Sequence, residues 1–348
     1  MAGHETLTAT LSTVAYGGLV QGHADELATL RRAFSEDGFV YLDLGEQEGD
    51  PGSVFHGIEA VFTSGAEFFS TSLDEKMRYD VDAIGPYKLH GYKPAERNGG
   101  IAENKKDGVE AYVLPRDGIC DNDTPEKIHL PPAFQGQRAL IKHLLDQLHS
   151  IGLVLLKALD NTGSLTSRHR PDKTSTSCLG VLRYPSLSAR TMHTGQGAHT
   201  DVGSLTILFC RERGLQVLDP RTEQWRYVEP RAGCAVINVG DSLRFLSGGA
   251  LRSSLHRVVP YPGVDIQDRA SCAYFMRPEL DSEFVDDSGR RWASLHWHMR
   301  KYRVYRSSAH EQKRDTASST ILTGKPSFLG FWEEERSAVG RSVSEDRS

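Results

Sequence analysis

The sequence predicts a mainly β fold, a closed β-sandwich or jelly roll with helices packed around it. Between residues 175 and 277, short apolar runs alternate with turn residues, which is typical of such sheets. Before them, residues 134–159 carry an apolar stripe at helical spacing, which predicts one long supporting helix. No internal repeat recurs at a solenoid period, so a repeat array is not expected.

The first part of the chain alternates helix and strand signals. Residues 24–34 place apolar side chains at helical spacing, and Gly38 then breaks the pattern before a short strand at 39–42. Residues 54–69 predict a second helix. A shorter helix is expected from Asp74, because a Thr-Ser capping signal precedes it.

The middle of the chain joins a long loop region to the supporting helix. Residues 81–132 are rich in glycine, proline and charge, which favours loops with a few short strands. The helical stripe that follows consists of Ile141, Leu144, Leu148, Ile151, Leu155 and Leu159.

The last part of the chain holds the strands of the predicted barrel. After them the sequence returns to helix at 292–305, and the polar tail from residue 333 is expected to fray. We expect one structural unit, in which residues 1–170 pack on a core of 171–280 and residues 281–348 add helices and a tail. The strand-like runs are residues 178–184, 205–210, 215–218, 234–238 and 272–276.

Composition and net charge indicate which kinds of partner, cross-link and location the chain is expected to have. The 348 residues carry a net charge of −5, which gives no electrostatic reason to expect nucleic acid or an anionic membrane. The five cysteines are odd in number and never spaced as C-x-x-C, so neither a disulfide framework nor a zinc ribbon is expected. The N-terminus lacks a signal-peptide pattern, and the apolar stretch at 151–159 is too short to span a bilayer. We therefore expect a cytoplasmic protein.

The pattern His199-Thr200-Asp201 is the first candidate metal motif. In a strand, residues two apart project to the same side, so one strand offers an imidazole and a carboxylate to one metal. A histidine from another strand would complete a face suited to iron(II), manganese(II) or cobalt(II). A second such pair, His23 and Asp25, starts a helix, where Asp25 is explained by the helix dipole.

Several histidines could supply the third ligand. His256 lies in a strand-like context, His193 lies near a glycine-containing segment, and His296 and His298 form a His-x-His in an amphipathic helix. Spacing alone leaves these alternatives open.

A second candidate anchor lies downstream. Arg269 and Ser271 share one face of a predicted strand. If that face lines the barrel interior, the guanidinium needs an anion, and its planar fork matches a carboxylate. Tyr184 ends another strand-like run and could donate to the same anion. The alternatives are a surface arginine beside a turn and a core tyrosine.

Together these motifs resemble the iron(II)/2-oxoglutarate-dependent oxygenases of the isopenicillin N synthase-like branch, which includes plant and fungal enzymes of specialised metabolism. The similarity runs over roughly residues 10–310. It rests on residues 199–201 with 203–208, 214–217, 238–241 with 254–258, and, in the front half, 37–40, 68–69, 75–76 and 91–92.

The resemblance implies a distorted double-stranded β-helix and metal ligation by His199, Asp201 and His256. It also implies that Arg269 and Ser271 hold the distal carboxylate of 2-oxoglutarate with help from Tyr184. The chain departs from the common plant pattern just before Tyr184, where it has Arg183 and many relatives have another tyrosine. The gap between His256 and Arg269 is also longer than in many plant relatives. Candidate substrate-pocket residues are Tyr92, Arg183 and Phe275.

The implied activity is a dioxygenase that uses iron(II), 2-oxoglutarate and O2. It would oxidise a small-molecule substrate of specialised metabolism by hydroxylation, desaturation, oxidative cyclisation or rearrangement. One alternative is an isopenicillin N synthase-type oxidase without 2-oxoglutarate, in which Arg269 and Ser271 hold a substrate carboxylate. Another is a β-barrel binding or storage protein without catalysis. The sequence carries no signal for oligomeric state.

Overall fold

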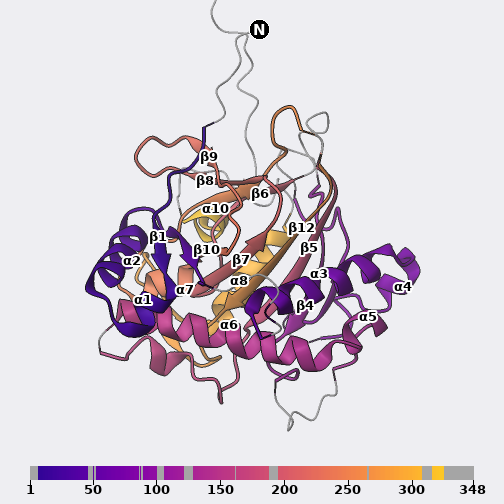
Figure 1. Ribbon diagram of the computed structural model, residues 1–348, viewed down its shortest axis with the longest axis horizontal. Coiled ribbons are helices and arrows are strands. Elements are labelled where there is room, and N and C mark those ends of the chain that lie inside the picture. Colours follow the sequence, from indigo (N-terminus) through magenta and orange to yellow (C-terminus); the bar gives the residue numbers. More distant parts are fainter. Residues whose placement is uncertain are drawn as a thin grey trace, which may run out of the picture.

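The computed structural model (Figure 1) describes residues 7–45, 50, 52–85, 87, 89–99, 106–120, 128–160, 162–187, 195–264, 266–307 and 316–324. The predicted polar tail from residue 333 and His193 lie outside these residues.

A large antiparallel sheet forms the centre of the molecule, with one parallel pair, β1 and β2, at its edge. Its strands, in spatial order, are β1 (Thr13–Ala15), β2 (Phe39–Asp43), β10 (Cys234–Val239), β7 (Leu205–Cys210), β12 (Ile266–Met276), β5 (Cys178–Leu187), β4 (Glu110–Pro115) and β3 (Gly91–Lys93).

A smaller sheet completes the barrel, and a hairpin of β13 (Glu283–Val285) and β14 (Arg291–Ala293) lies apart from both. From β5 onward the chain passes repeatedly between the large and the small sheet, which is the winding of a jelly roll. The small sheet consists of β6 (Gln196–His199), β11 (His256–Val258), β8 (Leu215–Leu218) and β9 (Trp225–Tyr227).

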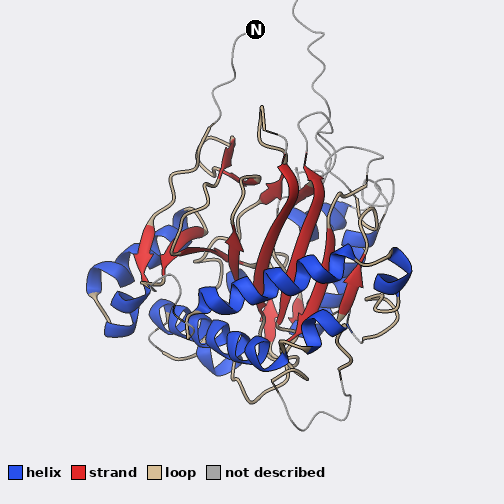
Figure 2. Cartoon of the chain, turned by 45° about the vertical axis from the view of Figure 1, so that its right-hand side comes forward, coloured by secondary structure: helices blue, strands red, loops and turns tan. Residues whose placement is uncertain are grey.

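Two long helices, α3 and α6, lie side by side across one face of the large sheet (Figures 1 and 2). The described helices are α1 (Tyr16–Gln21), α2 (Ala24–Glu36), α3 (Val54–Ser70), α4 (Leu73–Met77), α5 (Pro132–Gln135), α6 (Arg138–Leu159), the 3-10 turn η2 (Thr166–Arg168), α7 (Asp241–Leu246), α8 (Ser294–Arg306) and α10 (Thr316–Thr323).

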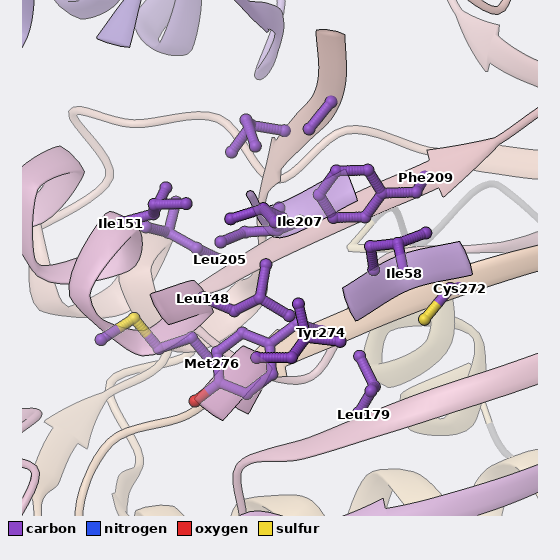
Figure 3. Close-up of a cluster of buried hydrophobic side chains, with 14 of the residues drawn as sticks. Ile58, Leu148, Ile151, Leu179, Leu205, Ile207, Phe209, Cys272, Tyr274 and Met276 are labelled. Atoms are coloured by element: carbon purple, nitrogen blue, oxygen red, sulfur yellow. The ribbon is translucent and has the colours of Figure 1, made fainter. Parts of the chain in front are cut away.

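The core fills the space between these helices and the sheet (Figure 3). Alternate residues of each strand point toward the helices, so that Ile207 and Tyr274 pack with Leu148 and Ile151 of α6. Gly152 permits this approach, because a Cβ there would overlap the sulfur of Met276. Burying each large apolar side chain contributes about 1.5–3 kcal/mol. The other residues of these strands face the small sheet.

Local sequence signals explain where the first helices begin. Ser53 caps α3 by accepting a hydrogen bond from the backbone N–H of His56. Ser72 caps α4, and Glu75 returns the bond to the Ser72 backbone, which completes a capping box. The expected capping signal before Asp74 is therefore confirmed.

Two helix predictions differ from the structure. The stretch expected as one helix from residue 134 divides into α5 and α6, because the backbone leaves the helical conformation at Gln137. The helix expected from residue 292 starts at Ser294, and the preceding residues pair in β14.

The apolar stretch of α6 is longer than the sequence suggested. With 22 residues, α6 is long and apolar enough to cross a bilayer by length and composition alone. Its apolar stripe is instead buried against α3 and the large sheet, as in the core helix of a folded domain.

Candidate metal centre

Three side chains converge where the small sheet meets the large one. β6 ends at His199 and β11 begins at His256, and the two residues are direct partners in the antiparallel pair. Their ring centroids lie 4.3 Å apart. Asp201 follows β6, and its Oδ1 lies 3.8 Å from Nε2 of His199 and 3.7 Å from Nε2 of His256. Two metal bonds of about 2.1 Å span at most about 4.2 Å, so each pair is close enough to share one ion.

Backbone carbonyls orient both imidazoles. Nδ1 of His199 lies 2.8 Å from the carbonyl oxygen of Gly197, and Nδ1 of His256 lies 3.2 Å from that of Ser254. A carbonyl only accepts, so each Nδ1 carries a proton, and in the neutral ring Nε2 then has its lone pair toward Asp201. This is the tautomer that a metal ligand requires.

The carboxylate of Asp201 is held by two residues of the large sheet. Its Oδ2 accepts hydrogen bonds from Thr206 Oγ1 at 2.6 Å and from Asn238 Nδ2 at 2.8 Å. Thr206 and Asn238 are direct partners on β7 and β10. Because both donors bind Oδ2, Oδ1 is left to face the imidazoles.

The protonation states of the site suit a divalent cation. Burial acts to raise the pKa of Asp201, but His256, His199 and the two hydrogen bonds outweigh it and lower the pKa to about 2. Burial, together with the neighbouring His256, lowers the pKa of His199 to about 3. At neutral pH the site therefore offers a carboxylate and a neutral imidazole, the forms that bind metal.

A buried ion pair supports the loop that carries Asp201. Lys301 of α8 donates to Thr200 Oγ1 at 2.7 Å and is paired with Asp241, and both charged groups are fully buried. The backbone N–H of Asp241 donates to the carbonyl oxygen of Asp201 at 2.8 Å. Tyr305, one turn along α8, lies edge-on to His199 at 5.6 Å between ring centroids. Sequence reasoning missed this support, because α8 is far from the motif along the chain.

The second predicted anchor lies on the inner face of the large sheet. Arg269 is 1% exposed and is the direct partner of Tyr184, whose ring centroid lies 5.0 Å from its guanidinium carbon. Its Nε donates to the carbonyl oxygen of Arg213 at 3.0 Å, whereas Nη1 is buried without a partner. Ser271, two residues on, shares this face and is also buried.

The unpartnered nitrogen of Arg269 fits an anionic ligand. Among the described residues, no carboxylate lies within ion-pair distance of Arg269. A buried guanidinium without a counter-charge is costly, so the site suits an added carboxylate such as that of 2-oxoglutarate. Tyr184 differs from expectation in one respect, because its hydroxyl donates to Gln196 at 3.1 Å.

Of the three candidate pocket residues, the structure turns one toward the metal site. Phe275 shares the inner face with Arg269 and is the direct partner of Thr206. Tyr92 and Arg183 point instead to the helix-covered face, where both bind the carboxylate of Glu110, at 2.6 Å and 3.0 Å. Strand alternation is the reason, since an inward Tyr184 requires its neighbour Arg183 to point outward.

The other candidate histidines lie elsewhere. His23 precedes the first turn of α2, in which Asp25 is one of two acidic residues, as the helix-dipole interpretation expects. His296 and His298 belong to α8, and Nε2 of His298 lies 2.9 Å from the carbonyl oxygen of Tyr87. Within the described residues, the cluster of metal-binding groups consists of His199, Asp201 and His256, with ligand atoms within 4.8 Å of one another.

Comparison with known proteins identifies similar sequences. Residues 175–278 match the 2OG-Fe(II) oxygenase superfamily. The 2-oxoglutarate-dependent dioxygenase frbH of Dothideomycetidae sp. is 35% identical, over 91% of this chain and 95% of its own length. The 2-oxoglutarate-dependent dioxygenase iboH of Amanita muscaria is 43% identical over 56% of this chain and 97% of its own length.

Solved structures share the fold. A full-length protein of Neurospora crassa, solved in complex with alpha-KG, superposes with a TM-score of 0.68 at 22% identity, covering 85% of this chain and 98% of that one. JOX2 in complex with 2OG, Fe and JA gives a TM-score of 0.63 at 19% identity, covering 88% of each chain. The predicted double-stranded β-helix with flanking helices is therefore confirmed.

Proposed function

Since this chain belongs to the 2OG-Fe(II) oxygenase superfamily, we propose that it is a 2-oxoglutarate-dependent dioxygenase that oxidises a C–H bond of a small organic molecule. In this proposal His199, Asp201 and His256 hold iron(II), and Arg269 with Ser271 holds the distal carboxylate of 2-oxoglutarate. The proposed setting is specialised metabolism, which the resemblance to fungal enzymes of that kind supports.

One observation carries the assignment. A buried triad of two imidazoles and one carboxylate shares the inner face of the barrel with a buried guanidinium that lacks a carboxylate partner. The triad suits a ferrous ion with open positions, and the guanidinium suits a dicarboxylate co-substrate. Either feature alone would also suit a different kind of site, but the two together match the needs of this reaction.

The protein's own contribution is placement. When bound, iron(II) and 2-oxoglutarate supply the power to oxidise an unreactive C–H bond with O2, leaving succinate and CO2. Gly197 and Ser254 fix the tautomers of the two histidines, while Thr206 and Asn238 fix the rotation of Asp201. Burial of the site excludes bulk water from the reacting groups.

The relatives favour 2-oxoglutarate as the co-substrate. Several similar fungal proteins are named 2-oxoglutarate-dependent dioxygenases. The alternative oxidase, in which Arg269 and Ser271 hold a substrate carboxylate, has no specific observation in its favour. A non-catalytic binding protein is also disfavoured, because it has no need to keep three ligands and a guanidinium in this arrangement.

Anaerobic titration tests the proposal. The iron(II)-loaded protein should develop a visible charge-transfer band when 2-oxoglutarate is added. Arg269→Gln should weaken 2-oxoglutarate binding at least about tenfold, because a charge-assisted bidentate contact is lost. Iron content should stay at the wild-type level in that variant. A wild-type protein that binds iron but shows no band would contradict 2-oxoglutarate use and favour the alternative oxidase.

A further inference from the structure

A second buried arginine lies next to the metal loop. Arg277 directly follows β12, continues the alternation of Arg269, Ser271 and Phe275, and is 9% exposed. A Cβ placed on Gly203, two residues after Asp201, would lie 2.8 Å from Cγ of Arg277. The Arg277 side chain therefore lies against the loop that carries the carboxylate ligand.

The guanidinium of Arg277 is only partly satisfied. Its Nη1 donates to the carbonyl oxygen of Thr176 and contacts Sγ of Cys178 at 3.2 Å, whereas Nε is buried without a partner. Its central carbon lies 5.4 Å from the ring centroid of Phe275. No carboxylate of the described residues lies within ion-pair distance of it.

A buried cation without a carboxylate partner is unusual in the described part of this chain. In the described part of the chain, six lysines and arginines are buried. Four are paired with carboxylates: Lys76 with Glu110, Lys93 with Asp107, Arg116 with Asp117, and Lys301 with Asp241. The remaining two are Arg269 and Arg277, both on the inner side of β12. If Arg269 binds a carboxylate of the co-substrate, Arg277 is left to bind another anion.

His298 of α8 supplies a complementary group. It is 3% exposed, and its Nε2 lies 2.9 Å from the carbonyl oxygen of Tyr87, so the proton is on Nε2. Nδ1 is then a hydrogen-bond acceptor, and it is buried without a partner. His298 and Tyr305 lie two turns apart on one side of α8, and the ring of Tyr305 contacts that of His199. Tyr305 thus links this part of α8 to the metal ligand His199. Burial, together with the positive charge of Arg277, lowers the pKa of His298.

We propose that Arg277 binds a carboxylate of the primary substrate and that Nδ1 of His298 accepts a hydrogen bond from an N–H or O–H of the same molecule. The substrate class is therefore a small amino or hydroxy carboxylic acid. This inference rests on the proposed function, since it assigns the co-substrate to Arg269 and leaves Arg277 for the molecule to be oxidised. Holding the acid at two points beside His199 would fix which C–H bond faces the metal.

The test uses the full chain loaded with iron(II) and 2-oxoglutarate without O2. The probes are the protein amino acids, the matching 2-hydroxy acids and the methyl ester of each. Binding is read from a change in the visible band and a rise in melting temperature, and succinate release is measured after O2 is admitted. At least one acid should bind and stimulate succinate release, and its ester should bind at least about tenfold more weakly.

Variants locate the effect. Arg277→Gln should abolish the preference for acid over ester while 2-oxoglutarate affinity stays within about twofold, and Arg277→Lys should recover part of the preference. His298→Phe should weaken the binding of amino or hydroxy acids. It should not weaken the binding of the corresponding carboxylic acid that lacks the amino or hydroxyl group. Arg291→Gln is the control, because Arg291 is exposed on β14 and should leave every readout unchanged.

Three results would overturn the inference. The first is that no acid of the panel changes the visible band or the melting temperature although the 2-oxoglutarate band forms. The second is equal binding of an acid and its ester, and the third is an Arg277→Gln protein that keeps the preference for acid over ester. Failure of the 2-oxoglutarate band itself counts against the proposed function instead. In that case the melting temperature still reports whether acids bind at Arg277.

Discussion

Asp201 illustrates how single residues are set for their task. One carboxylate oxygen is held by Thr206 and Asn238, and the other faces two imidazoles whose remaining nitrogens are held by carbonyls. Each ligand thus has one defined orientation before a metal arrives, which reduces the ordering that binding requires.

Removing one of the two hydrogen bonds that orient Asp201 should weaken iron binding. Thr206→Val keeps the shape of the side chain but deletes the 2.6 Å hydrogen bond to Oδ2, so Asp201 can rotate. Loss of such an outer contact lowers metal affinity about 10–100-fold. Competition with a coloured iron(II) chelator measures this. Thr206→Ser, which retains the hydroxyl, should bind nearly as wild type, and equal loss in both variants would contradict the role of the hydroxyl.

At this scale, sequence patterns predicted what lies within a few residues. The spacing of His199 and Asp201 indicated a shared side, and the structure has both facing one point. Tyr92 and Arg183 were expected in the pocket but lie on the opposite face, because a motif does not specify which face of a strand turns inward. Thr206 and Asn238 were missed because they meet Asp201 only through pairing of β7 with β10.

Buried histidines join several elements behind the metal site. His149 of α6 is bonded to the hydroxyl of Tyr274 on β12 at 2.9 Å and to the carbonyl oxygen of His169 at 3.0 Å. His169, next to η2, is bonded to Ser204 Oγ at 2.7 Å. Both rings therefore tie α6 to the sheet and to the end of the metal loop. In each ring one nitrogen donates to a carbonyl oxygen, and the other lies against a hydroxyl, which can donate to the neutral ring.

These two histidines should make the fold sensitive to acid. Burial lowers the pKa of His149 and of His169 to about 4, whereas the unfolded chain has the ordinary value near 6.5. Between those pH values the unfolded state binds more protons, so the free energy of unfolding falls as pH drops from about 6.5 to about 4. The loss is roughly 3 kcal/mol for each residue over that window.

Urea denaturation of the metal-free protein at about pH 7, 6 and 5 measures this loss, because these values lie on both sides of the ordinary histidine pKa of about 6.5. His149→Gln should reduce the difference in unfolding free energy between the highest and lowest pH, because a titrating group is gone, even if the variant is less stable throughout. An unchanged pH dependence in the variant would show that His149 is not neutral in the folded state.

At the scale of elements, the long periodic segments were predictable and their ends were not. The stripe of α6 and the helix α3 followed from apolar spacing. The break at Gln137 and the short strand β14 did not, because local periodicity does not specify where an element ends or which short segment pairs with another.

For the molecule as a whole, the double winding of strands explains why the site lies where it does. β6 and β11 of the small sheet bring His199 and His256 together, while β7, β10 and β12 of the large sheet supply Thr206, Asn238 and Arg269. The helices α3 and α6 cover the far face of the large sheet (Figure 2), whereas the metal ligands lie on the side of its inner face. The jelly roll was predictable from the spacing of strand-like runs, whereas its exact pairing required the structure.

The iron content of the protein tests the central claim most directly. After anaerobic loading with ferrous salt and removal of the excess, the wild-type chain should retain one iron per molecule. Asp201→Ala should retain none while keeping the circular dichroism spectrum of the folded wild type, because two imidazoles alone do not hold the ion. An Asp201→Ala protein that still carries one tightly bound iron would contradict the assignment of this site.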